Sequence, residues 1–218
     1  MSVEQSPEQV NARRAYNSNR RRERSRDTHN ALLDAASKRF LANGYTATTI
    51  DSIASDAAVS AATIYKTYGG KSGIVRALCQ RALGGQGPIP AEQRSDALQA
   101  NESDPRKVIE GWGRLTAEVA PRVAPLLLLL RDAADGEPTA GALLAELDGD
   151  RHARMTLNAR YLVKGGHVRP GVGLAEASDV LWTYSSPELY DLLVRRRKWS
   201  LRRYSQFIAR AITNALLE

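Results

Sequence analysis

The chain is poor in cysteine and has no long hydrophobic run. Its 218 residues include a single cysteine, Cys79, so no intramolecular disulfide can form and nothing calls for an oxidising compartment. The N-terminus lacks the apolar stretch of a secretory signal. The most apolar segment, residues 125–134, is far shorter than the roughly 20 residues that a transmembrane helix needs. These absences predict a cytoplasmic protein without a membrane partner.

Residues typical of catalytic and metal sites are also scarce. The chain has 3 histidines, His29, His152 and His167, and none has a metal-ligand spacing to another histidine, a cysteine or a pair of acids. Cys79 falls on an apolar helix face, which favours a buried structural thiol. No phosphate-binding loop or dinucleotide-binding glycine fingerprint occurs. We therefore expect no catalytic site, no metal and no cofactor, and a protein that is not an enzyme.

Positive charge is what the sequence has in excess. Lysine and arginine number 31 against 24 acidic residues, a net charge of +7, which favours partners with phosphates or anionic head groups. The polar segment 1–24 has too few apolar residues to order itself by burial, so we expect a basic, flexible arm. Its arginines are candidates for contacts with DNA phosphates or the minor groove, the alternative being a solvated charge run. These candidates are Arg20, Arg21, Arg22 and Arg24.

Apolar residues recur at three- and four-residue steps through most of the remaining chain, and no alternating strand pattern of useful length occurs. The sequence therefore predicts an all-α fold. Proline opens two of the expected helices, at Pro105 and Pro121, and Pro187 predicts a break in another. Loop signals in residues 84–105 predict a linker between a helix-turn-helix domain and a second helical domain, residues 25–83 and 84–218. The expected helices span residues 25–43, 49–56, 61–68, 71–83, 105–120, 121–135, 138–166, 173–197 and 200–218.

Residues 49–68 fit two short helices that cross over a tight turn of small residues. Thr48, with Asp51 three residues later, predicts the start of the first helix, and Ser60 predicts the start of the second. The second helix has short and hydroxylated side chains on its outer face, as a helix that enters the major groove of DNA requires. The alternative is an ordinary helical pair with an exposed, hydroxyl-rich surface.

The residues around this pair form a recognisable set: Phe40, Gly44-Tyr45-Thr46, Thr48-Thr49-Ile50, Ile53-Ala54, Val59-Ser60, Thr63-Ile64-Tyr65 and Lys71. On these residues, the segment 31–78 resembles the N-terminal domain of the TetR family of bacterial transcriptional regulators. The chain departs from the family at Ala58, where glycine is usual, at Tyr68, where phenylalanine is usual, and in the loop at 69–73.

The resemblance implies contacts with double-stranded DNA. Thr48 and Thr49 would meet a phosphate at the start of the first helix of the pair. The residues that would face the groove are Ser60, Ala61, Ala62, Thr63 and Lys66. Those that would hold phosphates are Tyr65, Tyr68 and Lys71. Tyr65 fits equally well as a core residue whose ring is buried and whose hydroxyl reaches solvent.

A single helix-turn-helix, which we call a reading head, covers one half of a palindromic operator. Useful affinity therefore requires a homodimer with two reading heads. The last helix offers an apolar seam at Leu201, Tyr204, Ile208, Ala211 and Ala215, with a purely intramolecular core helix as the alternative. The resemblance implies that the last two long helices form a four-helix dimer interface and that the central helices enclose a pocket for an unidentified small-molecule inducer. The pocket candidates, each of which fits plain core packing as well, are Trp112, Leu126, Leu130, Arg131, His152, Met155, Tyr161, Trp182 and Tyr184.

Together these features predict a sequence-specific DNA-binding transcriptional regulator, a repressor that a small-molecule ligand releases from its operator. The alternative is a non-specific architectural DNA-binding protein, which would share the basic arm and the helix-turn-helix.

Overall fold

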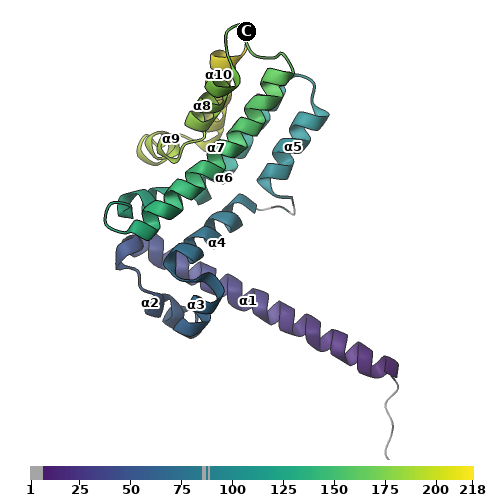
Figure 1. The fold of residues 1–218 in the computed structure, drawn as a ribbon, viewed down its shortest axis with the longest axis vertical. Coiled ribbons are helices and arrows are strands. Elements are labelled where there is room, and N and C mark those ends of the chain that lie inside the picture. The colour runs from purple at the N-terminus through teal and green to yellow at the C-terminus, as the bar shows by residue number, and fades with distance from the viewer. Residues whose placement is uncertain (1–6, 85–86, 88) are drawn as a thin grey trace, which may run out of the picture.

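The computed structural model describes residues 7–84, 87 and 89–218, and within these ranges the chain forms helices and no strands. The all-α prediction is therefore confirmed. Figure 1 shows the N-terminal helices at one end of the molecule and the later helices stacked beyond them, with the first helix projecting sideways. The first four are α1 (Pro7–Ala47), α2 (Ile50–Asp56), α3 (Ala61–Tyr68) and α4 (Lys71–Gly84). The remainder are α5 (Ala91–Asn101), α6 (Pro105–Ala133), α7 (Pro138–Lys164), α8 (Leu174–Tyr184), α9 (Pro187–Tyr190), a π-helix (Asp191–Arg196) and α10 (Leu201–Leu216).

A small apolar core fixes α2 and α3 against α1 and α4. Phe40, Ile53, Ile64 and Ile74 are fully buried, one from each of the four helices. Each of these side chains contributes about 1.5–3 kcal/mol by leaving water. Because every helix supplies an anchor, the short helices α2 and α3 are held rigidly despite having few apolar residues of their own.

Helix α1 begins much earlier than the sequence predicted. We expected a flexible arm over residues 1–24 and a helix from residue 25, whereas the helix begins at Pro7. No proline or glycine interrupts residues 8–43, and arginine, alanine and glutamate are good helix formers, so helix propagates outward from the anchored part of α1. At the predicted stop, Gly44 leaves the helical conformation with a φ of 82°, and helix resumes beyond this kink as far as Ala47.

Helix α6 is a single helix where two were predicted. The expected boundary at Pro121 is wrong, because α6 runs from Pro105 to Ala133 with Pro121 inside it. Proline removes one backbone donor and crowds the preceding turn. Ala117 and Ala124 are buried on either side of Pro121, so packing against the neighbouring helices keeps both halves on one path.

Two further segments can be compared with the sequence prediction. The predicted linker contains a helix, α5, over Ala91–Asn101. The predicted break before Pro187 is confirmed, because α8 ends at Tyr184 and Ser186 caps the short helix α9. Among the described residues, no helix combines the length and the apolar composition that crossing a membrane requires.

The two parts of the molecule share one apolar contact. The C-terminal end of α6 and the N-terminal end of α7 pack into the same core cluster as α1 to α4. Leu126, Leu130 and Leu143 are the larger buried side chains that they contribute. A second cluster joins α6, α7, α8 and α10 at the other end of the molecule. The turn between α6 and α7 therefore lies close to α1 and α4, which hold the helix-turn-helix.

Candidate nucleic-acid interface

The turn between α2 and α3 is closed by backbone hydrogen bonds. The Val59 amide donates to the Ala54 carbonyl oxygen at 3.0 Å, and Ala57 donates to Ile53 at 3.0 Å. Ala58, which stands where the resembled family has glycine, adopts a left-handed φ of 52°. An L-residue with a Cβ pays about 1–2 kcal/mol in this conformation. The turn is therefore formed at a local conformational cost that the core below it offsets.

Side-chain caps begin both helices of the pair. Ser60 caps α3 as predicted, accepting a hydrogen bond from the Thr63 amide at 3.1 Å. The cap predicted for α2 is wrong by one residue, because Thr49 accepts from the Ser52 amide at 3.1 Å. The Thr48 side chain is buried, and its hydroxyl donates to the Gly44 carbonyl oxygen at 2.7 Å. The Thr48 hydroxyl is therefore committed inward, and only its backbone remains for a phosphate.

The outer face of α3 is free of apolar packing. Ala62, Thr63 and Lys66 are exposed, whereas Ala61, which was predicted to face the groove, is half-buried and packs against the apolar core. Ile64, on the opposite face, is fully buried and anchors the helix. Tyr65 has 56% of its surface exposed, so it is not the core ring that remained as an alternative. Among the residues that the structure describes, no carboxylate forms an ion pair with Lys66. The short side chains and the lysine thus project together into solvent.

Tyr68, at the end of α3, is engaged by α1. Its ring stacks on His29 with centroids 5.6 Å apart, and its hydroxyl lies 2.6 Å from His29 Nδ1. Burial raises the pKa of Tyr68 above its ordinary value, so the phenol stays protonated and can donate. The predicted phosphate contact would therefore need this hydrogen bond to be shared or broken.

Lys71, at the start of α4, is turned toward the second part of the molecule. Its Nζ donates to the Tyr45 carbonyl oxygen at 3.2 Å and lies 3.4 Å from Glu137 Oε1. The same ammonium sits 4.5 Å from the centroid of the Tyr45 ring. The side chain of Lys71 is 22% exposed. The Lys71 ammonium, which was predicted to hold a phosphate, thus already has partners within the chain.

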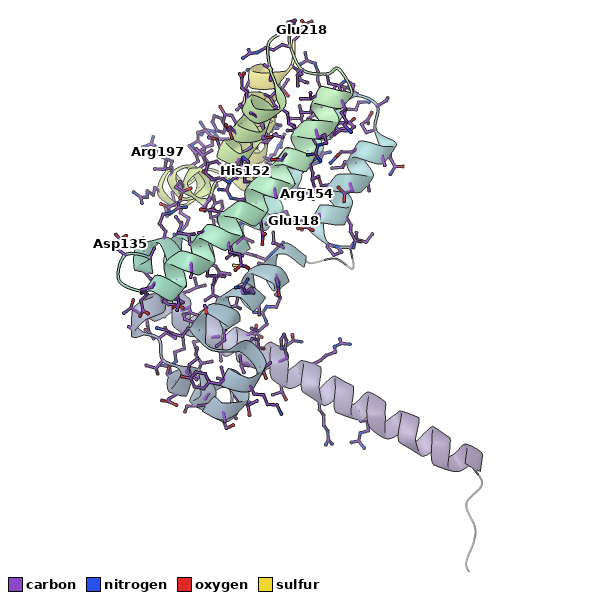
Figure 2. All side chains as sticks on the ribbon, viewed as in Figure 1. Glu118, Asp135, His152, Arg154, Arg197 and Glu218 are labelled. Carbon is purple, nitrogen blue, oxygen red and sulfur yellow. The ribbon has the colours of Figure 1, made fainter. Side chains whose placement is uncertain are left out.

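The arginines of α1 are described only in part. Arg20 and Arg24 are exposed, whereas the side chains of Arg21 and Arg22 lie outside the described residues. The other basic run, residues 195–198, lies elsewhere: Figure 2 places Arg197 on the flank of the molecule, well away from α2 and α3. Asp191 pairs with both Arg195 and Arg196, at 3.1 and 2.6 Å. This second run therefore does not extend the candidate DNA-binding surface.

One ion pair that the sequence did not indicate holds α2 on α1. Arg39 donates two hydrogen bonds to the Asp56 carboxylate, at 2.6 and 2.7 Å. The hydrogen bond from Arg39 lowers the pKa of Asp56, and the positive charges of Arg39 and Lys38 lower it further. The two residues are 17 positions apart, so no local spacing rule could have paired them.

The predicted pocket residues are not gathered in one place. Leu126 and Leu130 belong to the apolar core shared with the helix-turn-helix, so we no longer expect them to line a pocket. Trp112 and Tyr161 form an edge-to-face pair in the second core, with centroids 6.3 Å apart. The Trp112 indole nitrogen is buried without a hydrogen-bond partner. Trp112 therefore combines burial, aromatic surface and an unused donor, and the Trp182 indole nitrogen is likewise buried without a partner.

The remaining candidates lie on α6, α7 and α8. Arg131 forms ion pairs with Asp148 and Glu188. His152 lies 3.3 Å from Asp179 and packs edge-on against Trp182. Met155 is half-buried beside the second core, and Tyr184 packs edge-on against Phe207. Sequence reasoning missed Arg151, which donates to the Trp182 carbonyl oxygen at 2.6 Å and whose pKa burial lowers.

The apolar face of α10 is largely used within the chain. Tyr204 and Ile208 are fully buried in the second core, whereas Leu201 is exposed and Ala211 and Ala215 are half-buried. The exposed side of α10 is polar and carries Arg202, Arg203, Gln206, Arg210 and Asn214. A partner chain would therefore meet the half-buried alanines and this polar side, not the broad apolar face that the sequence suggested.

Candidates for other chemistry are few. Cys79 is buried, as predicted, and burial raises the pKa of its thiol to about 12, which keeps the thiol protonated. Within the described ranges, no group of three or more histidine, cysteine, aspartate and glutamate side chains is placed to hold a metal ion.

Comparison with known proteins adds the family context. Residues 32–78 match the family model described as bacterial regulatory proteins, tetR family. The chain is 38% identical over 71 residues to YvkB, an uncharacterized HTH-type transcriptional regulator of Bacillus subtilis strain 168. It is 45% identical over 58 residues to YdeS, another such regulator of the same strain. These matches span only 38% and 29% of the two relatives' lengths.

Solved structures extend the likeness over most of the chain. NalD, the secondary repressor of the MexAB-OprM multidrug efflux pump in Pseudomonas aeruginosa, superposes with a TM-score of 0.72 at 18% identity. That match covers 89% of this chain and 98% of NalD. The SmeT–triclosan complex superposes with a TM-score of 0.68 at 18% identity, over 88% of this chain and 92% of SmeT. At these identities the likeness shows a shared fold.

Proposed function

Because this chain belongs to the TetR family of bacterial regulatory proteins, we propose that it is a transcriptional regulator that binds a palindromic operator in double-stranded DNA. Residues 25–83 would form the DNA-binding domain, and residues 84–218 the ligand-binding and dimerisation domain. The proposed action is repression, which a small-molecule ligand relieves.

The observation that carries this proposal is the outer face of α3. Ala62 and Thr63 are short enough for the backbone to approach the major groove closely, and Lys66 and Tyr65 extend beyond them. Ile64 fixes the helix from below, so this face is presented without rearrangement. A recognition helix has this combination of a rigid inner face and a polar, shallow outer face.

Phosphate contacts would frame the base contacts. Thr49 and Ser60 lie at the starts of α2 and α3, with exposed side chains. Tyr68 is the last residue of α3 and Lys71 is the first residue of α4. Such contacts set the register of the protein on the duplex and supply most of its salt-dependent affinity.

Two reading heads would come from a homodimer. A palindromic operator presents half-sites about 34–36 Å apart, one helical turn of DNA, so the heads must be held at this separation. We propose that α8 and α10 form the interface, with the half-buried Ala211 and Ala215 beside the exposed polar side of α10.

The ligand would bind in the second part of the molecule. NalD is named as a repressor and SmeT is solved with triclosan, which supports a ligand-responsive repressor of the same fold. Trp112 and Tyr161 are the proposed ligand contacts, because they offer aromatic surface and an unpaired indole donor. A ligand that favours the DNA-free spacing of the heads by a few kcal/mol is enough to release DNA.

A gel-shift competition tests the proposal. The labelled duplex has the sequence upstream of the protein's own gene, and the competitors are the same duplex unlabelled and a random duplex. A specific regulator should prefer the upstream duplex by roughly a thousandfold or more. Equal competition by the two duplexes would instead identify a non-specific architectural DNA-binding protein.

A further inference from the structure

Lys71 lies where the proposed DNA-binding domain, residues 25–83, meets the turn between α6 and α7. It is the first residue of α4, and Glu137 is the residue that precedes α7. Their side chains, Nζ to Oε1, are 3.4 Å apart and are 22% and 27% exposed. This ion pair therefore links the proposed DNA-binding domain to the proposed ligand-binding domain.

The surroundings hold the lysine in this position. The Tyr45 carbonyl oxygen accepts a hydrogen bond from Lys71 Nζ at 3.2 Å, and the Tyr45 ring lies 4.5 Å from the ammonium. Tyr45 is 2% exposed and packs in the same apolar cluster as Ala140 and Leu143 of α7. The ammonium thus has an acceptor, a ring face and a carboxylate around it, two of which come from Tyr45.

Only one of these partners competes directly with DNA. A phosphate is an anion, and so is Glu137, whereas the carbonyl and the ring of Tyr45 carry no net charge and do not repel a phosphate that approaches the ammonium. An ammonium on a four-carbon stem can pair with either anion, but pairing fully with both is opposed by their mutual repulsion.

We infer that Glu137 is an autoinhibitory residue: it competes with a DNA phosphate for Lys71 and so weakens DNA binding in the conformation described. This inference rests on the proposed function, since it requires Lys71 to contact DNA. Glu137 sits on the turn that joins α6 to α7, so any shift of these two helices changes the distance between Glu137 and Lys71. The contact would thereby report the state of the second domain to the DNA-binding surface.

A neighbouring ion pair supplies a matched control. Arg76, on α4, pairs with Glu146, on α7. It crosses between the same two helices, but Arg76 is not among the residues proposed to contact DNA. Glu146→Gln therefore removes an acidic charge and a contact between α4 and α7 without freeing a phosphate-binding lysine.

The experiment measures DNA affinity by fluorescence anisotropy for wild type, Glu137→Gln, Lys71→Gln, the double variant and Glu146→Gln. Two probes are used, the upstream duplex and a random duplex, at fixed salt. Glu137→Gln should bind DNA about two- to fivefold more tightly, the range expected for releasing a partly exposed ion pair. The gain should vanish in the Lys71→Gln background, and Glu146→Gln should match wild type within twofold.

The outcomes separate the inference from the proposed function. The inference is overturned if Glu137→Gln binds no more tightly than wild type, if its gain persists without Lys71, or if Glu146→Gln shows an equal gain. The proposed function fails if wild type does not prefer the upstream duplex, and the effect of Glu137 is then still read from the random duplex. Absence of DNA binding by all five proteins overturns both.

Discussion

At the scale of single residues, Ala58 is a non-glycine residue in the turn between α2 and α3 whose backbone adopts a left-handed conformation that alanine disfavours. Its φ is 52°, and its side chain is exposed, so the Cβ gains nothing from packing. Ala58→Gly should raise the free energy of unfolding by about 1 kcal/mol, because relief of the left-handed strain exceeds the extra entropy of glycine in the unfolded chain. Chemical denaturation at constant pH measures this change.

Ala153→Gly is the matched control for this substitution. Ala153 is also exposed but lies within the long helix α7, so glycine there should destabilise the protein by about 1 kcal/mol. A loss of stability in Ala58→Gly comparable to the control would mean that the turn does not hold residue 58 in the left-handed region.

Lys66 is the residue on which the proposed reading face depends most, because it is exposed and has no carboxylate partner among the described residues. Lys66→Ala should weaken binding to the upstream duplex by about 1–3 kcal/mol if the ammonium contacts a base edge, and should then narrow the preference over random DNA. Lys164→Ala, at the far end of α7, removes the same charge from an exposed site and should leave both values unchanged. Equal losses in the two variants would place Lys66 outside the interface.

At the scale of elements, the ion pair between Arg39 and Asp56 fastens α2 to α1. Since Arg39 lowers the pKa of Asp56 in the folded state, the pair stabilises the protein above the ordinary aspartate pKa of about 3.9 and is lost as the pH falls through the lowered value. Asp56→Asn should therefore reduce the melting temperature at pH 6–7, and the difference from wild type should shrink below about pH 4. Thermal unfolding followed by circular dichroism across this range measures both effects.

Arg39→Gln provides the complementary test of the same contact. It should lower the melting temperature near neutral pH as Asp56→Asn does, and the double variant should add little to either single change. Fully additive losses would show that the two side chains stabilise α1 and α2 independently.

The extended first helix allows the arginine run to be tested as a unit. Replacing Arg20, Arg21 and Arg22 with alanine should flatten the dependence of log K on log salt by roughly 2.7, if each arginine contacts one phosphate. Alanine at Arg195, Arg196 and Arg197 removes the same charge from the end of the π-helix, where Arg197 lies on the flank of the molecule (Figure 2), and is the control. A slope that changes equally in both triple variants would reflect total charge and not a contact by α1.

The bounds of an element were predictable where residues at its ends determine the local backbone conformation. Ser60 and Gly69 mark the start and the end of α3 through a side-chain cap and a left-handed glycine, and both signals are visible in the sequence. The continuity of α6 was not predictable. Proline usually marks a helix boundary, but at Pro121 packing against residues distant in the sequence keeps the helix continuous. The Lys71–Glu137 contact was invisible for the same kind of reason, since its partners are 66 positions apart and meet only after folding.

At the scale of the whole molecule, the fold places the proposed reading face at one end and the proposed dimer interface toward the other (Figure 1). The sequence indicated an apolar seam along the last helix, but it could not show that Tyr204, Ile208 and Ile212 would be buried within their own chain. Helical periodicity shows that a face is apolar. It does not show whether that face is covered by the same chain or by a partner. What remains for a partner is the polar side of α10 and its small half-buried alanines.

This arrangement predicts that like charges added to α10 will separate the protomers. Gln206 and Asn214 are exposed on α10, so Gln206→Arg with Asn214→Arg should leave the fold of one chain intact. Wild type should sediment at twice the chain mass of 23.9 kDa and the double variant at the chain mass, because each new arginine would face its symmetry mate. Ala153→Arg with Leu157→Arg, at exposed sites on α7, adds the same charge and should remain dimeric.

The same variants connect assembly to function. A separated chain retains one intact reading head, so it should keep the salt-dependent, non-specific component of DNA binding while losing most of its preference for a palindrome. Sedimentation velocity and the anisotropy competition are therefore measured on the same samples. A double variant on α10 that stays dimeric, or that separates and still prefers the palindrome as strongly as wild type, would contradict an interface built on α10 and the need for two linked heads.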